Sequence, residues 1–171
     1  MLITLRYRMA PRNPDKINYI KLKYVLIPRA NITLRKLFRK KWLTAHKSAW
    51  SETNVQGQQF IEGSGKDLFL TASRRRKKLL RSGRVDLWDF QLLSTILLKF
   101  EFGKVGNLTK QEKKAVENLA VIHFDFRMNS NEINCKEFDV AWNNIAEILV
   151  KLGDSSDALK ALKLNKVRTI E

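Results

Sequence analysis

Cysteine and histidine are scarce in this chain. Its 171 residues include one cysteine, Cys135, and two histidines, His46 and His123. One cysteine cannot form an internal disulfide, and these three residues do not have the spacing of zinc ligands. The sequence therefore excludes a disulfide-stabilised scaffold. It leads us to expect neither a metal nor a cofactor, and it favours a reducing intracellular compartment.

Glycine, proline and long hydrophobic runs are scarce as well. There are seven Gly and three Pro, while 44% of the residues are hydrophobic, which favours one helix-rich domain over disorder. The longest apolar runs, such as residues 92–98, are too short to cross a bilayer, so we expect no transmembrane segment. Residues 1–10 carry two arginines and no continuous apolar stretch. They do not resemble a secretory leader, and an organelle-targeting segment and an irregular terminus both stay open.

Acidic residues are missing mainly from the first part of the chain. Residues 1–50 contain thirteen Lys or Arg and one acid, Asp15, whereas residues 101–171 contain eleven of each kind. The net charge of +16 therefore comes from the first hundred residues. Such asymmetry favours a polyanionic partner, either nucleic acid or an anionic surface, and it is also compatible with a solvated basic face.

Apolar residues at helical spacing are what the sequence has in abundance. They predict an all-α, single-domain helical bundle of about five to seven helices. We expect a flexible or irregular N-terminus over residues 1–15, the helical domain over residues 16–164 with a loop at about 48–65, and a C-terminal tail over residues 165–171.

Proline and short polar residues predict where the helices begin and end. Pro28 is expected to end or kink the first helix, and a second helix is expected to open near residues 31–33. Residues 67–81 have the pattern of one helix. Asp86 is expected to cap the following helix and Asp154 the last one.

Two basic runs are candidate nucleic-acid contacts. The first lies on a predicted helix with Trp42 and the second contains five consecutive cations: Arg35, Arg39, Lys40 and Lys41, then Arg74, Arg75, Arg76, Lys77 and Lys78. Both could contact phosphates. A solvated helix face is the alternative for each run, and the second also matches a nuclear-localisation pattern. Trp42 itself is expected in the core.

Residues 109–129 form the best-defined predicted helix. Thr109 and Glu112 have the spacing of a capping box, which marks a helix start. A broad apolar face follows at helical spacing: Ala115, Leu119, Ile122 and Phe126. His123 and Arg127 lie one turn apart beside this face.

Three stretches together resemble the HEPN-like domain (higher eukaryotes and prokaryotes nucleotide-binding). They are residues 18–42, 65–98 and 138–154, in this order. The version they resemble most is that of the DAZ-interacting zinc-finger ubiquitin ligase and of invertebrate immune-receptor-like proteins. The resemblance implies an all-helical bundle, often a homodimer, in a family associated with innate immunity and ubiquitin ligation.

Active members of that family are metal-independent RNases whose motif is Arg-Asn or Arg-His followed by a further His. The resemblance places this motif in the helix at 109–129. Ile122 matches, but His123 stands at the Arg position, Phe124 at the Asn position, and Met128 or Asn129 at the His position. His123 and Arg127 could form a reordered acid–base pair, or they could be structural.

The sequence thus predicts a non-catalytic HEPN-like binding or dimerisation module more than an enzyme. Two alternatives stay open: an endoribonuclease using His123 and Arg127, and a basic RNA-binding structural protein. A homodimer and RNA are the expected partners. The expected location is intracellular and cytoplasmic, with the nucleus left open by residues 74–78.

Overall fold

The computed structural model describes residues 13–103, 106–128 and 132–164, with the side chains of residues 126–128 excepted. Across these residues the fold is all-α and forms one helical bundle. The elements are α1 (Pro14–Lys21), the π-helical turn η1 (Leu22–Leu26), α2 (Ile27–His46), α3 (Asn54–Glu62), α4 (Lys66–Thr71), α5 (Arg74–Ser82), the 3-10 turn η2 (Val85–Leu87), α6 (Phe90–Lys99), α7 (Lys110–Met128), α8 (Cys135–Lys151) and α9 (Ser156–Leu164). With α1, η1 and α2 counted as one helix, the described residues contain eight α-helices. The predicted all-helical bundle is confirmed.

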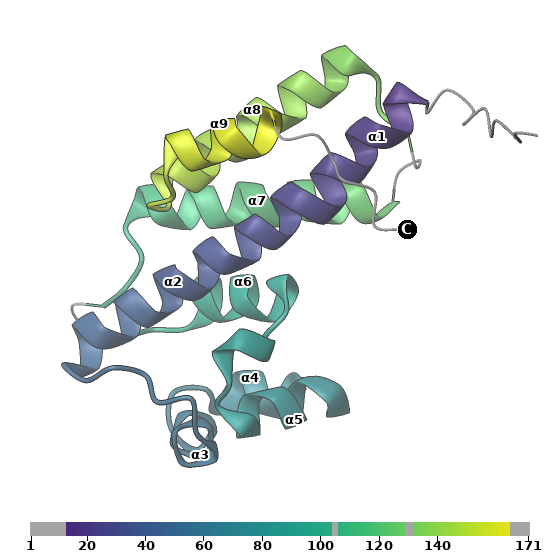
Figure 1. The fold of residues 1–171 in the computed structure, drawn as a ribbon. Coiled ribbons are helices and arrows are strands. Elements are labelled where there is room, and N and C mark those ends of the chain that lie inside the picture. The colour runs from purple at the N-terminus through teal and green to yellow at the C-terminus, as the bar shows by residue number, and fades with distance from the viewer. Residues whose placement is uncertain (1–12, 104–105, 129–131, 165–171) are drawn as a thin grey trace, which may run out of the picture.

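One continuous helix, α1–η1–α2, crosses the whole molecule (Figure 1). Its α1 end packs on α8, its α2 end packs on α6, and α7 lies against both α6 and α8. The short helices α3, α4 and α5 gather at the far end of α2, away from α8 and α9 (Figure 1). None of the helices in the described ranges is both long enough and apolar enough to cross a bilayer.

Pro28 does not end the first helix, which was one of the two outcomes predicted for it. The helix widens to a π-turn just before the proline, where the backbone N–H of Ile27 donates to the carbonyl of Leu22. A π-turn relaxes the backbone at the point where proline lacks a donor and crowds the preceding turn. The predicted start near residues 31–33 is therefore wrong, because Asn31 and Thr33 lie inside α2.

An aromatic cluster forms the centre of the core between α2 and the short helices. Ring centroids of Phe38 and Trp50 lie 5.1 Å apart, those of Trp42 and Trp50 lie 4.6 Å apart, and those of Phe60 and Phe100 lie 4.9 Å apart. Trp42 is 5% exposed, which confirms its predicted core position. These rings attach the α3–α5 end of the molecule to the long helix.

Part of the predicted loop at residues 48–65 is helical. Residues 54–62 form α3, whose N-cap Thr53 accepts a hydrogen bond from the backbone N–H of Gln56 at 3.3 Å. This helix was not predicted because it lacks apolar residues at helical spacing. Amide side chains and a glycine make up most of it, and its two buried apolar residues, Phe60 and Ile61, are adjacent. Trp50 and Phe60 are buried, as expected of residues that pin this segment to the core.

Three other predicted boundaries are wrong. The single helix predicted over residues 67–81 is divided into α4 and α5 by extended backbone at Ala72 and Ser73, where Ser73 caps α5. Asp89, not Asp86, caps α6 by accepting from the N–H of Leu92 at 2.8 Å. Ser155 begins α9, because its hydroxyl accepts from the N–H of Ala158 at 3.3 Å.

Asp154 has a structural role instead of capping α9. Its carboxylate forms an ion pair with Arg29 and accepts a hydrogen bond from the hydroxyl of Thr33 at 2.8 Å. Both partners lie on α2, so this side chain, 3% exposed, fastens the α8–α9 turn to the long helix. Burial raises the pKa of Asp154, but hydrogen bonds from Arg29, Thr33 and the Ser155 backbone outweigh it and hold the pKa below its ordinary value.

Candidate nucleic-acid interface

Most of the basic residues predicted on the first run face other parts of the chain. Arg35 is half-buried and donates from its guanidinium to the carbonyl of Trp88 at 3.1 Å. Burial lowers the pKa of Arg35. Arg39 pairs with Glu52 at 2.6 Å, and Lys40 is exposed.

Lys41 is buried and connects two helices. Its ammonium donates to Glu112 Oε2 at 2.6 Å and to the carbonyl of Asn107 at 3.2 Å. Glu112 also accepts from the backbone N–H of Thr109 at 2.8 Å, which is one half of the predicted capping box. The other half is present too, since Thr109 Oγ1 accepts from the N–H of Glu112 at 3.1 Å. Lys41 therefore anchors α7 to α2 from within the fold.

The second basic run lies on α5, which is fixed at its C-terminal end. Trp88 donates from its indole to the carbonyl of Leu79 at 3.1 Å, and Trp50 donates to the carbonyl of Gly83 at 2.6 Å. Gly83 closes the helix in the left-handed conformation, with φ of 66°. Two buried indoles thus satisfy carbonyls that a helix end leaves without partners. The remaining length of α5 presents its cations at the surface.

Five cations of α5 line one hollow of about 690 Å³: Arg74, Arg75, Lys77, Lys78 and Arg81. Every described residue that lines it is basic. Lys77 and Arg81 also lie over the ring of Phe69 from α4, at 5.4 and 4.9 Å from its centroid. Arg76, the other predicted cation of the run, turns away and donates to Gln91 Oε1 at 2.6 Å.

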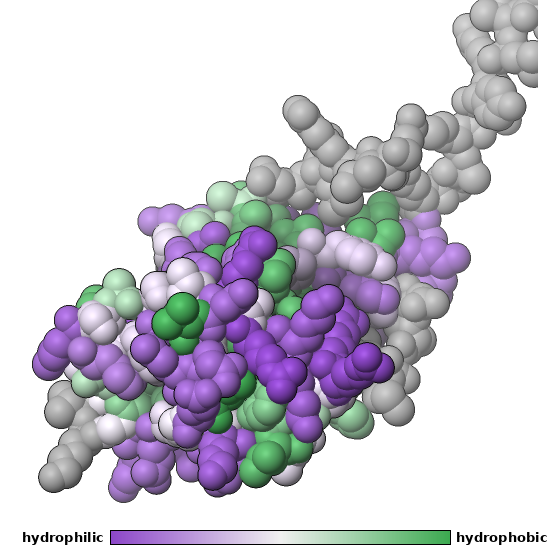
Figure 2. Space-filling view, turned by 90° about the horizontal axis from the view of Figure 1, so that it is seen from below, coloured by the Kyte–Doolittle hydropathy of each residue, from purple (hydrophilic) through white to green (hydrophobic). Residues whose placement is uncertain are grey.

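Hydrophilic residues cover most of this end of the molecule. Figure 2 views the protein from the side on which α3, α4 and α5 lie, and hydrophobic residues form only small separate patches there. Concentrated cations on an otherwise polar face suit a flexible polyanion, because phosphates can reach several ammonium and guanidinium groups without desolvating apolar surface.

A second hollow adjoins the first between α3 and α5. It has a volume of about 740 Å³ and shares two residues of α5, Lys78 and Arg81, with the cationic hollow. Its other wall, on α3, contains no basic residue and is mostly polar: Asn54, Val55, Gln58, Gln59 and Glu62. This wall was not predicted, because residues 48–65 were assigned to a loop. Thr53, a residue type favoured at the N-cap, was the signal in the sequence that a helix begins there.

His123, the histidine of the predicted catalytic pair, lies beside α6. Its ring stacks on Phe90 with centroids 4.2 Å apart and planes 14° from parallel. It lines a small hollow of about 260 Å³ with Ser94, Thr95 and Lys99, among others. The side chain of Arg127 lies outside the described residues, as does Asn129. The proposed acid–base pair therefore remains a prediction.

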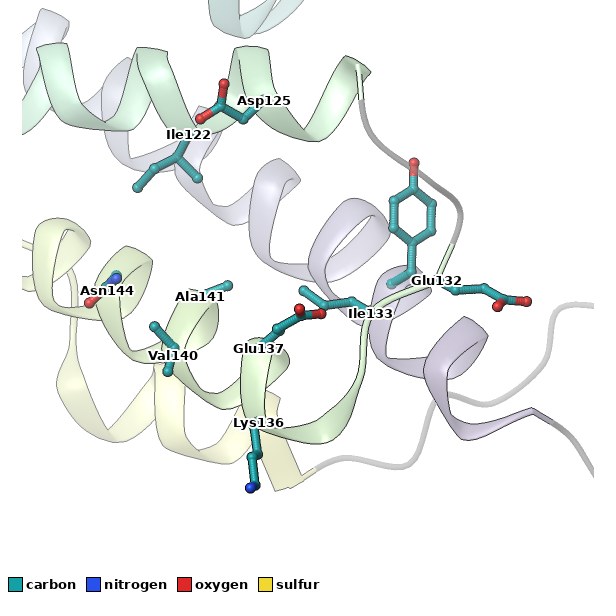
Figure 3. A pocket seen from close by; sticks show the side chains of 10 residues that line it. Ile122, Asp125, Glu132, Ile133, Lys136, Glu137, Val140, Ala141 and Asn144 are labelled. Atoms are coloured by element: carbon teal, nitrogen blue, oxygen red, sulfur yellow. The ribbon is translucent and has the colours of Figure 1, made fainter.

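A further hollow, of about 650 Å³, lies between α1, α7 and α8 (Figure 3). Ile122, Ile133, Val140 and Ala141 make part of its lining apolar, and Asp125, Glu132 and Glu137 outnumber Lys136. This balance of charge disfavours a polyanion. The hollow is therefore a poor site for RNA.

The described residues contain no group of three or more His, Cys, Asp or Glu side chains that could hold a metal ion. The side chains that line the cationic hollow of α5 support charge recognition by ammonium and guanidinium groups. Comparison with protein-family models, with curated proteins and with solved structures gives no match for this chain.

Proposed function

We propose that this protein is a non-catalytic, HEPN-like helical module that binds RNA through α5. The observation that carries the proposal is the hollow lined by five cations of one helix, Arg74, Arg75, Lys77, Lys78 and Arg81. These cations would neutralise phosphate groups of a nucleic acid, and release of the counterions condensed on that nucleic acid would drive binding.

The position of α5 supports this proposal. The indoles of Trp50 and Trp88 hold the end of the helix to the core, so the cations project from a fixed support. A binding surface on a fixed element loses less conformational entropy when the ligand arrives. The basic residues of α2 contribute less, because Arg35, Arg39 and Lys41 already have partners inside the protein.

The test is the salt dependence of RNA binding by the full chain and by a charge-reversal variant. Fluorescence anisotropy with a short labelled single-stranded RNA should give an affinity that falls steeply with salt. The variant Arg75→Glu/Lys78→Glu should bind at least about tenfold more weakly, with a slope of log K against log salt shallower by about one to two. The control is Lys113→Glu/Lys114→Glu, which makes the same charge change on exposed residues of α7.

Two results would contradict the proposal. One is an RNA affinity that does not depend on salt. The other is an equal loss of binding in the α5 variant and in the α7 control, because net charge alone would then account for binding. Circular dichroism should show unchanged helicity in both variants, since the substituted side chains are solvent-exposed.

The non-catalytic part of the proposal has its own test. The departures from the family motif at His123 and Phe124 support it, as does the stacking of His123 on Phe90. We expect no cleavage of single-stranded RNA by the purified chain. Cleavage that disappears in His123→Ala would show that the protein is a ribonuclease.

A further inference from the structure

The second hollow, between α3 and α5, is a groove whose two walls differ in chemistry. Lys78 and Arg81 of α5 supply positive charge, whereas α3 supplies amides from Asn54, Gln58 and Gln59. Lys78 and Arg81 also line the cationic hollow, so the two hollows are neighbours on α5. A strand whose phosphates lie on α5 can therefore reach the α3 wall with its bases.

Glu62 makes the α3 wall unfavourable for phosphates and so determines which way round a strand can lie in the groove. Its Oε1 accepts a hydrogen bond from the Nε2 of Gln58 at 2.5 Å, and Oε2 is not part of that bond. A carboxylate repels phosphate, so the backbone of a bound strand is kept to the α5 side. The same carboxylate accepts well from the exocyclic amine of a base, as acidic side chains do with N4 of cytosine.

The groove also offers an apolar surface and amide groups. Val55 is 67% exposed, although it is a large hydrophobic residue, and it lines the groove. Such a side chain can pack against the face of a base, and a neighbouring amide can donate to or accept from the base edge. An exposed valine beside amide groups is not required for a charged surface that only contacts water.

The width of the groove is fixed by close backbone packing. A Cβ on Gly57 of α3 would lie 2.5 Å from the carbonyl oxygens of Leu80 and Arg81 and 2.6 Å from the nitrogen of Gly83. Only glycine allows the two helices to approach so closely. The two walls are therefore held at a set separation before any ligand binds, which favours discrimination between bases.

We propose that this groove binds an unpaired base of single-stranded RNA and that Glu62 selects cytosine over uracil. The inference rests on the proposed RNA-binding function of α5. The two pyrimidines have the same size, but position 4 carries an amine donor in cytosine and a carbonyl acceptor in uracil. The carboxylate of Glu62 can accept a hydrogen bond from the amine of cytosine, whereas it repels the carbonyl oxygen of uracil. In an A-form RNA duplex the position-4 groups lie in a deep, narrow major groove that side chains cannot read, so this contact requires an unpaired base.

The experiment compares the dissociation constants of oligo(C) and oligo(U) of equal length at neutral pH and one salt concentration. The wild-type chain should bind oligo(C) about tenfold more tightly, the discrimination expected of one good base contact. In Glu62→Gln the ratio should fall to about one, because the glutamine amide can donate to the carbonyl of uracil. Glu117→Gln makes the same charge change on an exposed residue of α7 and should leave the ratio at its wild-type value.

The outcomes separate this inference from the function on which it rests. Equal affinity of the wild-type chain for the two oligomers, or a ratio unchanged in Glu62→Gln, would overturn the role of Glu62 while the α5 proposal stands. Binding of duplex RNA as tight as that of single strands would overturn the requirement for an unpaired base. RNA binding through α5 would instead be contradicted if Arg75→Glu/Lys78→Glu left the affinity for both oligomers unchanged.

Discussion

Gly57 lies in the middle of α3, where helix propensity alone favours alanine. An exposed glycine-to-alanine change inside a helix stabilises a protein by up to about 1 kcal/mol. Here the added methyl would meet backbone atoms of α5 at 2.5 Å, and backbone cannot move aside as a flexible side chain can. We therefore expect Gly57→Ala to destabilise the protein by about 2 kcal/mol or more.

Chemical denaturation of Gly57→Ala measures this change in the free energy of unfolding. Gly63→Ala is the matched control, because a Cβ there would lie 3.2 Å from the carbonyl of Gln59, a contact that a small shift relieves. An unchanged or higher stability of Gly57→Ala would mean that α3 and α5 are not packed as described.

Asp154 makes stability depend on pH in the acid range. Its pKa in the folded protein lies below the ordinary value of an aspartate, because the hydrogen bonds from Arg29, Thr33 and Ser155 outweigh the effect of burial. A carboxyl with a lowered folded pKa contributes stability above its unfolded pKa, about 3.9, and this contribution is lost as pH falls through the folded value. Asp154→Asn should therefore cost about 2 to 3 kcal/mol at neutral pH.

The difference between wild type and Asp154→Asn should narrow below about pH 4, where the wild-type carboxylate takes up a proton. Urea denaturation across a pH series measures it. Asp157→Asn is the control, since Asp157 is 94% exposed and makes only a surface contact with Lys160. If the difference in free energy of unfolding between the two proteins did not change with pH, the lost stability would come from altered packing and not from the charge of Asp154.

At the scale of helices, a buried ion pair connects α2 to α7. Lys41 and Glu112 are 11% and 16% exposed, and burial of Glu112 is outweighed by its hydrogen bonds with Lys41 and Thr109, which lower its pKa. Glu112→Gln can keep the capping box but leaves the ammonium of Lys41 without its counter-charge. We expect it to cost about 2 to 3 kcal/mol.

Adding Lys41→Met should restore much of that loss, because the buried charge is then removed together with its partner. A double-mutant cycle on thermal or urea unfolding measures the coupling. Additive effects of the two substitutions would show that the pair contributes nothing beyond packing. The same Lys41→Met variant should retain RNA affinity, since Lys41 faces the interior.

The helices that could be predicted from sequence were those with local signals. The capping box at Thr109 and Glu112 identifies the start of α7, and Trp42 is recognisable as core from its position in the apolar stripe of α2. The missed features depend on distant residues. Asp154 looks like a cap until Arg29 and Thr33 come near it.

The candidate site was predictable in part for the same reason. The run at residues 74–78 identifies the basic helix, but only folding separates Arg76, which turns to Gln91, from Arg81, which joins the surface cluster. The cations of α2 look equally available in sequence. In the structure, however, Arg39 and Lys41 pair with acidic residues that lie 13 and 71 residues away in the chain. Charge patterns do not reveal which charges are neutralised within the fold.

At the scale of the whole molecule, the net charge of +16 opposes self-association. The homodimer implied by the family resemblance would have to overcome this repulsion, which salt screens. Val121 and Phe124, 60% and 63% exposed, lie one turn apart on α7. A dimer that uses these two side chains at its contact should strengthen with salt, while RNA binding should weaken.

Sedimentation equilibrium at micromolar concentration and increasing salt measures that trend. Phe124→Glu should shift the protein to a monomer, whereas Val140→Glu, at a residue of 61% exposure on α8, should not. A wild-type monomer at every salt concentration would contradict this dimer contact.

The π-turn at Leu22–Leu26 has a consequence for how this sequence could vary in evolution. It holds one residue more than a regular helical turn needs. Deleting a single residue there would restore an ordinary α-helix without rotating α1 relative to α2, because the π-turn takes up the extra residue within one wide turn. Tyr19, which is buried on α1, would then stay on its present side of the helix. A first helix that is one residue shorter at this point is therefore compatible with the same packing of α1 on α8.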